Sequence, residues 1–178
     1  AQVLAVCDVD PRHLASGKKV VEDHYAAQMR GGTYKGCDAY SDFRKIIERD
    51  DIDAVMIATP DHWHALMSVM AIRAGKDVIC EKPTLTVREG RVLADTVKRY
   101  GAVFQMSTVD RAMACHHRMA ELVRNQRIGK LQRIIVGLPG GPGEKGDPTP
   151  KPVPEGFDYD MWLGPAPLAP YCPGRTHW

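Results

Sequence analysis

The sequence predicts an α/β protein whose strands form a parallel sheet. Short, unbroken apolar runs alternate along the chain with longer segments in which apolar residues recur at helical spacing. Polar or turn-forming residues follow each of these runs, as they do at the ends of buried parallel strands. The chain has 178 residues, of which 44% are hydrophobic, and this length suits one domain plus part of another.

Four apolar runs are the predicted strands, because strands buried on both faces carry continuous apolar residues. They span residues 3–7, 54–58, 77–80 and 102–106. Helices are predicted at residues 11–28, 43–49, 61–74 and 86–100. Pro11 can open the first helix, and Ser41 with Asp42 can cap the second. Gly75 and Gly101 follow the third and fourth helices, where glycine ends a helix.

We place a domain boundary near residues 107–111, so that residues 1–108 form one domain and residues 109–178 begin a second. A helix at 113–125 and a strand at 131–136 are predicted past this boundary. Residues 137–155 are rich in Gly and Pro and predict a loop. This loop contains a Gly-x-Gly-x-x-Gly pattern at 141–146. It does not predict a phosphate-binding turn, because a strand before it and a helix after it are both lacking.

The composition argues against several classes of partner. The 24 Lys and Arg residues and the 22 Asp and Glu residues leave a net charge of +2, which is too small to predict nucleic acid or an acidic membrane as a partner. No apolar run approaches the ~20 residues of a membrane-spanning helix. The five Cys are scattered without CxxC spacing and predict reduced thiols. We therefore expect a cytoplasmic protein, although an export signal on a longer parent chain would not be visible in this sequence.

Candidate functional residues lie directly after the predicted strands. In an open parallel sheet, ligands bind beyond the carboxyl ends of the strands, which lie along one edge. Polar and turn residues at these ends are therefore expected to converge. They are Asp8, then Thr59, Pro60 and His62, then Glu81, Lys82 and Pro83, and finally residues 107–111.

Asp8 follows the first predicted strand. In dinucleotide-binding folds, an acid at the end of a strand accepts hydrogen bonds from the adenosine ribose hydroxyls and disfavours the 2′-phosphate of NADP. Asp8 could equally be an exposed turn acid or the cap of the next helix. Arg12, on the following turn, could stack on adenine or be solvated, and it could also weaken a preference for NAD.

Lys82 is the candidate catalytic residue. A lysine at the mouth of a parallel sheet can hydrogen-bond a substrate hydroxyl and lower the barrier for removal of its proton. Glu81 would hold or tune the lysine charge, and Pro83 would fix the loop. Lys82 could instead be an ordinary surface lysine.

The histidines do not predict a metal site. His62 and His64 lie at the start of a predicted helix, where side chains two residues apart diverge by about 200°. His116 and His117 are adjacent on another predicted helix and are expected to form a surface pair. No bound metal is therefore expected.

Taken together, these motifs resemble the Gfo/Idh/MocA oxidoreductases, the family of glucose–fructose oxidoreductase and inositol dehydrogenase. The resemblance is carried by VLAVCDVD at 3–10, DAVMIATPDHWH at 53–64, AGKDVICEKP at 74–83, RIGKL at 127–131 and WLGPAP at 162–167. It implies a Rossmann-type parallel sheet whose first strand and Gly-rich turn are missing from this sequence. The start of an α+β C-terminal domain would follow, so that the chain is truncated at both ends.

The resemblance also implies an activity and a site. The protein would bind NAD, or NADP, and transfer hydride at a carbon of a sugar, sugar derivative or cyclitol. The full-length protein would be a homo-oligomer. By position, Lys82 would be catalytic and Arg111 would reach the substrate. The cofactor-binding residues would be Asp8, Arg12, Thr59, Pro60, His62, His64, Glu81, Lys82 and Pro83.

Two other functions stay open. One is an NAD-using glycosidase or lyase of the same superfamily. Lys82 favours the plain oxidoreductase over this branch, because the glycosidases tend to lack that lysine. The other is a non-catalytic binding or structural protein on a truncated Rossmann scaffold, which the missing phosphate-binding turn would favour.

Overall fold

The computed structural model of the chain describes residues 1–82, 84–138 and 148–176. The strands are β1 (Ala5–Cys7), β2 (Asp38–Tyr40), β3 (Ala54–Ile57), β4 (Asp77–Cys80) and β5 (Phe104–Met106). The helices before β5 are α1 (Pro11–His24), α2 (Ala26–Arg30), α3 (Arg44–Ile47), α4 (Asp61–Arg73) and α5 (Val87–Tyr100). Those after it are the 3-10 helix η1 (Val109–Ala112), α6 (Ala114–Arg124), α7 (Tyr159–Leu163) and α8 (Pro173–Thr176). The predicted α/β class is confirmed.

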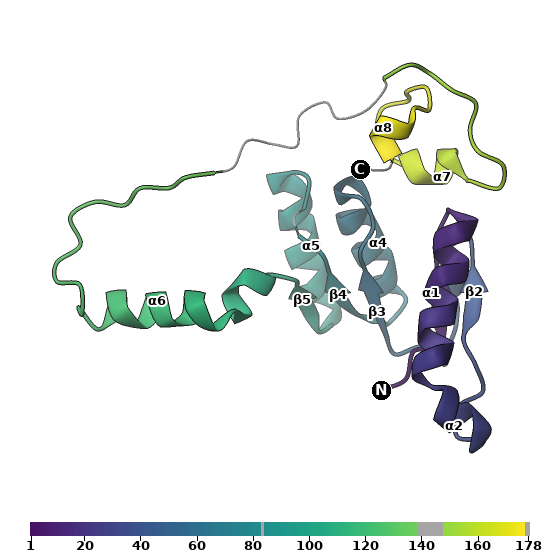
Figure 1. Cartoon of the computed structure of the whole chain (residues 1–178), viewed down its shortest axis with the longest axis horizontal. Coiled ribbons are helices and arrows are strands. Elements are labelled where there is room, and N and C mark those ends of the chain that lie inside the picture. The colour runs from purple at the N-terminus through teal and green to yellow at the C-terminus, as the bar shows by residue number, and fades with distance from the viewer. Residues whose placement is uncertain (83, 139–147, 177–178) are drawn as a thin grey trace.

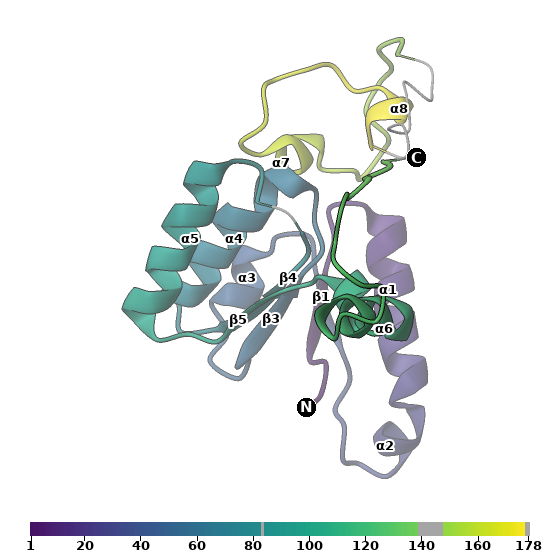
Figure 2. The same ribbon diagram turned by 90° about the vertical axis from the view of Figure 1, so that its left-hand side faces the viewer.

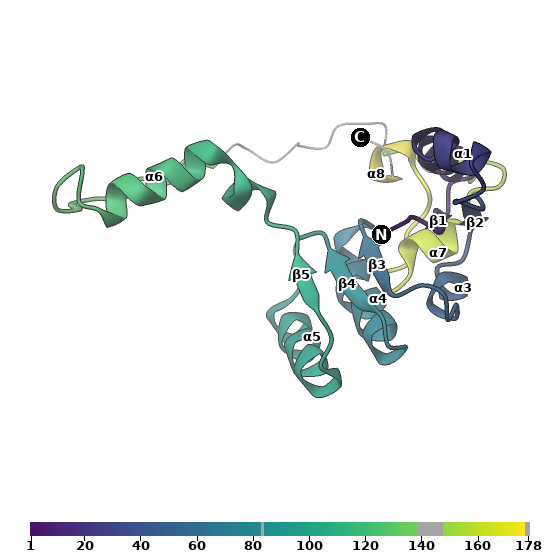
Figure 3. The same ribbon diagram turned by 90° about the horizontal axis from the view of Figure 1, so that it is seen from below.

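All strand pairs are parallel, but the strands form two sheets (Figure 1). β1 pairs with β2, with Val6 opposite Ala39. The second sheet has the order β3-β4-β5. Helix α1 lies on one side of the strands, and α4 and α5 lie on the other (Figure 3). This is the layering of a doubly wound fold, divided between β1 and β3.

Helix α4 carries the larger core cluster. Its buried side chains include Trp63, Met67 and Ile72, which pack against Val78 of β4 and Leu93 of α5. Eight of its residues are buried, because it packs on the β3-β4-β5 sheet with α5 beside it (Figure 3). It is therefore apolar over most of its circumference, as a helix covered on several sides must be.

Helix ends follow local sequence signals. Thr86 caps α5 in a reciprocal capping box, in which its side chain accepts from the Glu89 N–H while Glu89 accepts from the Thr86 N–H. Gly101 ends the same helix in the left-handed conformation, with φ of 66°, which glycine adopts without a steric penalty. The predicted helix at 86–100 is therefore confirmed.

Three sequence expectations for local structure are wrong in part. The helix expected over 11–28 is divided at Tyr25, whose ring stacks on Tyr34 with centroids 4.4 Å apart. Strand β2 was not predicted, because the run Asp-Ala-Tyr is short and polar and becomes a strand by pairing with β1.

The third expectation that is wrong is the strand at residues 131–136. These residues have no strand conformation. Ile134, Ile135 and Val136 are each more than 70% exposed. A strand requires hydrogen bonds from a neighbour, and none pairs with this segment in the part of the chain that the structure describes. The Gly-x-Gly-x-x-Gly pattern at 141–146 lies outside the described residues, as does Pro83.

Candidate functional site

A cavity of about 830 Å³ lies between β1 and β3. This volume falls within the range of small-molecule and cofactor sites. Its walls come from both strands, from α1 and α4, and from the segment around α7. The cavity therefore occupies the division between the two sheets.

The polar end of this cavity is formed by residues that follow β1 and β3. Asp8, Thr59 and Pro60 all line it. One carboxylate oxygen of Asp8 accepts from the Asp10 N–H at 2.8 Å. The other lies 3.8 Å from His13 Nδ1. Asp8 is thus held by the turn into α1 while part of its carboxylate remains accessible from the cavity.

Thr59 offers a polar group that the protein leaves unsatisfied. Its Oγ1 is buried and has no hydrogen-bond partner among the described residues. Its carbonyl oxygen lies 2.7 Å from His64 Nε2, so this nitrogen carries the proton and donates it. His64 is only 1% exposed and is absent from the cavity lining that the structure describes. His64 therefore fixes the Thr59 backbone through this hydrogen bond without lining the cavity itself.

The segment around α7 lies beyond the carboxyl ends of the strands (Figure 2), and its Phe157, Met161 and Trp162 line the cavity. The Asp158 N–H donates to Val9 O at 3.1 Å, just beyond β1. Trp63 Nε1, in the first turn of α4, donates to Met161 O at 2.9 Å. His62 Nε2 lies 2.9 Å from Trp162 O. One short segment therefore contacts the ends of both sheets.

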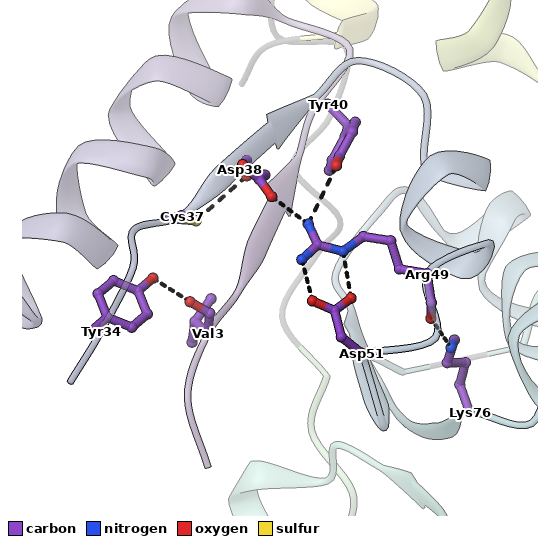
Figure 4. A network of polar contacts seen from close by, with 8 residues as sticks. All are labelled: Val3, Tyr34, Cys37, Asp38, Tyr40, Arg49, Asp51 and Lys76. Carbon is purple, nitrogen blue, oxygen red and sulfur yellow. Dashed lines mark hydrogen bonds and ion pairs between the residues drawn. The ribbon is translucent and has the colours of Figure 1, made fainter. Parts of the chain in front are cut away.

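The amino ends of the two sheets are joined by Arg49 (Figure 4). Its guanidinium donates to Asp51, which precedes β3, with an Nη2–Oδ2 distance of 2.7 Å. The same group donates to Asp38 at the start of β2 at 2.6 Å and to Tyr40 Oη at 3.3 Å. These hydrogen bonds, the one donated to Asp51 foremost, raise the pKa of Arg49 above its usual range. Lys76 Nζ donates to the Arg49 carbonyl and supports this junction.

Glu81 and Lys82 follow β4. The Glu81 N–H donates to Ile57 O at 2.8 Å, which extends the β3–β4 ladder by one bond. The Lys82 side chain is exposed. In the described part of the chain it forms no ion pair with Glu81, so the expected pairing of their charges is not observed.

Arg12 is held by Asp10 rather than directed at the cavity. The Asp10 carboxylate accepts from Arg12 Nε at 3.1 Å, from Nη2 at 2.7 Å and from the Arg12 N–H at 2.8 Å. Asp10 is only 3% exposed and caps α1. These hydrogen bonds from Arg12 hold the pKa of Asp10 well below its usual range.

We expect the Asp10→Asn variant to lose stability in a pH-dependent manner. The lowered pKa means that the Asp10 charge stabilises the fold above the ordinary aspartate pKa of about 4, and that this contribution is lost as the pH falls toward the lowered value. Urea unfolding should show a difference from the unchanged protein at pH 7 that shrinks toward pH 3. Asp10→Ala also removes the cap and should cost about 1 kcal/mol more. A difference independent of pH would contradict this assignment.

Arg111 lies on η1, which leads into α6 and away from the sheets (Figure 1). Helix α6 has no buried residues. Arg111 is exposed and is not part of the described cavity lining. The structure thus does not bring Arg111 together with Asp8 and Thr59.

The sequence did not predict several of the residues that close the cavity. Phe157 and Met161, which the sequence did not single out, line it, as does Trp162 of the WLGPAP motif. Their signal was the aromatic-rich run at 157–162, whose Phe157 and Tyr159 form a second core cluster.

Cys7 also borders the cavity. Burial, with Asp8 and Asp42 nearby, raises the pKa of its thiol to about 12. Cys7 is therefore a neutral thiol at physiological pH and not a thiolate nucleophile. All five cysteines are free.

No group of three or more His, Cys, Asp or Glu residues in the described part of the chain is arranged to hold a metal ion. No helix among residues 1–82, 84–138 and 148–176 is both long and apolar enough to cross a membrane.

Comparison with known proteins finds two matching family descriptions. Residues 9–108 match the Gfo/Idh/MocA oxidoreductase family, NAD-binding Rossmann fold. Residues 143–178 match the C-terminal alpha/beta domain of the same family.

The chain is also similar in sequence to named relatives. The chain is 37% identical over 139 residues to glycosyl hydrolase family 109 protein 2 of Shewanella sp. strain ANA-3, which covers 77% of this chain and 29% of that relative. It is 29% identical to 1,5-anhydro-D-fructose reductase of Ensifer adhaerens over 65% of this chain and 36% of the relative. The chain thus spans about a third of the length of these relatives.

A solved structure of scyllo-inositol dehydrogenase from Lactobacillus casei, with bound NAD(H) and scyllo-inositol, superposes with a TM-score of 0.60 at 25% identity. The match covers 71% of this chain and 34% of that one. Myo-inositol 2-dehydrogenase from Lactobacillus plantarum superposes with a TM-score of 0.60 at 26% identity, over 73% of this chain and 35% of that one.

Proposed function

The chain belongs to the Gfo/Idh/MocA oxidoreductase family, and on this premise we propose that it forms part of an NAD-dependent dehydrogenase. The substrate would be a sugar, sugar derivative or cyclitol, in line with the names of the inositol dehydrogenases and the anhydrofructose reductase that it resembles. One observation carries the proposal: Thr59, whose buried hydroxyl has no hydrogen-bond partner among the described residues, lines the same cavity as Asp8.

These residues fit a dinucleotide. The Asp8 carboxylate accepts hydrogen bonds from ribose hydroxyls, and the Thr59 hydroxyl gains the partner that it lacks within the described chain. Pro60 shapes the turn between β3 and α4. His62 and His64 act as positioning residues, through Trp162 O and Thr59 O respectively. NAD, when bound, supplies the group that accepts or donates hydride.

We propose Lys82 as the residue that exchanges a proton with the substrate hydroxyl. Its exposed ammonium follows β4, at the carboxyl edge of the sheet. After losing a proton to solvent, Nζ would accept the proton that leaves the substrate hydroxyl. Glu81 would orient this loop. The roles expected for Arg12 at the adenosine side and for Arg111 at the substrate would require both side chains to turn toward the cavity, whose described lining includes neither.

The direct test is a titration of NADH into the protein, followed by nicotinamide fluorescence. Saturable binding with a dissociation constant on the order of micromolar, together with NAD reduction that depends on an added cyclitol such as scyllo-inositol or on a sugar, is the expected result. An absence of NADH binding would contradict the proposal. A thermal shift with NADH provides a second readout that does not require turnover.

We expect Asp8→Asn to weaken NADH binding by about 10-fold, since hydrogen bonds to a charged acceptor are worth roughly 1.5–3 kcal/mol. Binding of NADPH should improve, because a negative charge near its 2′-phosphate is removed. The amide oxygen still accepts from the Asp10 N–H, so the turn is retained. Parallel fluorescence titrations with both cofactors measure the change in preference. Equal losses for NADH and NADPH would place Asp8 away from the ribose.

A second candidate function is NAD-using glycoside cleavage, which the resemblance to glycosyl hydrolase family 109 proteins favours. The two functions differ in their redox balance. A dehydrogenase accumulates NADH, whereas a glycosidase that oxidises its substrate transiently releases sugar without net NADH formation. Assays with a chromogenic α-N-acetylgalactosaminide and with free cyclitol, both monitored for NADH absorbance, distinguish them.

The remaining expectations concern the whole protein. We propose that residues 1–108 form the cofactor domain, that residues 109–178 begin the substrate domain, and that the full-length protein is a cytoplasmic homo-oligomer. The two separate matches at 9–108 and 143–178 support this division. Either nicotinamide cofactor is compatible with the carboxyl edge, and Asp8 favours NAD.

A further inference from the structure

The first turn of α1 places a histidine beside Asp8. His13 lies in this turn and lines the same cavity as Asp8. Its Nδ1 is 3.8 Å from Asp8 Oδ2, whereas Asp8 Oδ1 accepts from the Asp10 N–H. One oxygen of Asp8 is thus held by the turn, and the other faces the imidazole of His13.

The separation of these two groups leaves room for a ligand atom. At 3.8 Å, the two atoms can form an ion pair, but they are too far apart for a hydrogen bond. The side chain of His13 is 59% exposed and that of Asp8 is 37% exposed. A ligand oxygen bound at this point of the cavity can therefore contact the carboxylate and the imidazole together.

Arg12, the other basic side chain of this turn, is engaged elsewhere. Its guanidinium donates to both carboxylate oxygens of Asp10, and Arg12 is not part of the described cavity lining. The sequence singled out Arg12 as the residue that could weaken a preference for NAD. The basic side chain that lines the cavity beside Asp8 is instead His13, one residue further along the helix.

NAD and NADP differ in the group that such a pair would contact. NAD carries a hydroxyl at the 2′ position of its adenosine ribose, and NADP carries a phosphate there. A carboxylate accepts a hydrogen bond from the hydroxyl and repels the phosphate, whereas an imidazolium donates to the phosphate and offsets this repulsion. The first turn of α1 also favours an anion, because the amino end of a helix carries a partial positive charge.

Histidine brings a dependence on pH, because its ordinary charge change falls between about pH 5 and 8. Its charged neighbours on α1 are Asp10 and Arg12. Hydrogen bonds from Arg12 are the main reason that the pKa of Asp10 is lowered, and the charge of His13 adds to this effect. In the segment packed against this turn, the Asp158 N–H donates to Val9 O, and Tyr171 lies near Arg12. The ionisable side chains of the described cavity lining are Cys7, Asp8, Asp10, His13, Asp51 and Asp53. Among these residue types, histidine alone ordinarily titrates near neutral pH.

We propose that His13 is a second determinant of cofactor choice, which forms with Asp8 a paired site for the adenosine 2′ position. The pair takes the 2′-hydroxyl of NAD through Asp8 and, when His13 carries its second proton, the 2′-phosphate of NADP through the imidazolium. A lower pH therefore shifts the preference of the site toward NADP. The role of His13 rests on the proposed function, because it concerns the same bound dinucleotide.

The test compares the dissociation constants of NADPH and NADH, measured by nicotinamide fluorescence at about pH 5.5 and about pH 8, on either side of the histidine range. In the unchanged protein, the ratio of the NADPH constant to the NADH constant should fall as the pH is lowered. In His13→Gln, which cannot take up a proton, this ratio should fall at least about fivefold less, a difference of about 1 kcal/mol. The 2′-phosphate itself takes up a proton at about pH 6, and comparing the two proteins removes that contribution.

Two further variants make the comparison specific. His13→Lys keeps a positive charge at both pH values, so it should favour NADPH at both, and its ratio should change no more than that of His13→Gln. His24→Gln removes an exposed histidine from the last turn of the same helix, outside the described cavity lining. It should behave like the unchanged protein. Circular dichroism at both pH values checks that each variant is folded.

The outcomes separate the role of His13 from the proposed function. If the ratio for His13→Gln follows that of the unchanged protein at both pH values, His13 does not determine cofactor choice, although both cofactors still bind. An equal loss of the pH dependence in His24→Gln would also overturn the proposal. If the unchanged protein binds neither NADH nor NADPH at either pH, the proposed function fails, and the role of His13 fails with it.

Discussion

Replacing Lys82 by alanine is expected to reduce turnover by about 10²- to 10⁴-fold, the usual contribution of a positioned acid or base. The Lys82 ammonium is exposed beyond the end of β4 and forms no ion pair among the described residues, so no structural contact is lost with it. Folding and NADH affinity should therefore change little. Steady-state rates of NAD reduction, with cyclitol or sugar as substrate, measure the effect.

Two controls make this prediction specific. Lys98→Ala removes an exposed lysine from the last turn of α5, far along the chain from the site, and should leave turnover unchanged. Lys82→Arg keeps the positive charge but not the compact ammonium and its readily lost proton, so turnover should remain low. Turnover of Lys82→Ala within about twofold of the unchanged protein would remove this lysine from the mechanism.

Gly164→Ala is expected to destabilise the fold by about 2–5 kcal/mol, combining backbone strain with overpacking. Gly164 has φ of 48° and ψ of −120°, a conformation that side chains rarely adopt. A Cβ at this position would lie 2.1 Å from Trp63 Cζ2. Because Trp63 is a member of the main core cluster, it cannot move aside cheaply.

Urea unfolding followed by tryptophan fluorescence measures this loss of stability. The matched control is Gly17→Ala in α1, where a Cβ meets nothing within 4 Å and φ is not positive. Alanine there should be neutral or stabilising by up to about 1 kcal/mol. Similar changes in the free energy of unfolding for Gly164→Ala and Gly17→Ala would show that the close approach of Gly164 to Trp63 does not exclude a side chain at position 164.

The Gly164 contact also connects stability with the candidate site. Displacement of Trp63 would break its bond to Met161 O and disturb the neighbouring contact of His62 with Trp162 O. These contacts close the carboxyl end of the cavity. If Gly164→Ala unfolds at nearly the same urea concentration as the unchanged protein but binds NADH weakly, closure of the site is separable from global stability.

Much of the fold follows from signals that lie within a few residues of one another. The capping box of Thr86 and Glu89, the proline at the start of α1 and the left-handed Gly101 set helix ends that short-range hydrogen bonds and sterics determine. The continuous apolar runs indicated β1, β3, β4 and β5 for a similar reason, since burial on both faces demands them.

For the site, the sequence placed polar residues beyond the strand ends, and the structure brings Asp8, Thr59 and Pro60 to one cavity. It did not indicate that Asp10 would engage Arg12, or that His64 would be buried behind Thr59. These contacts depend on side-chain directions in the first turns of α1 and α4, which residue type alone does not specify.

Local sequence alone thus indicated β1, β3, β4 and β5 and the helices between them, and it indicated the sheet edge at which we propose that a ligand binds. Tertiary structure decided whether a segment became a strand, because a ladder needs a partner from elsewhere in the chain. Asp38–Tyr40 acquired one in β1, and residues 131–136 did not within the described chain. It also decided that the α7 segment and Arg49 hold the two sheets apart around a cavity, since such contacts join residues distant in sequence and arise only when the elements pack.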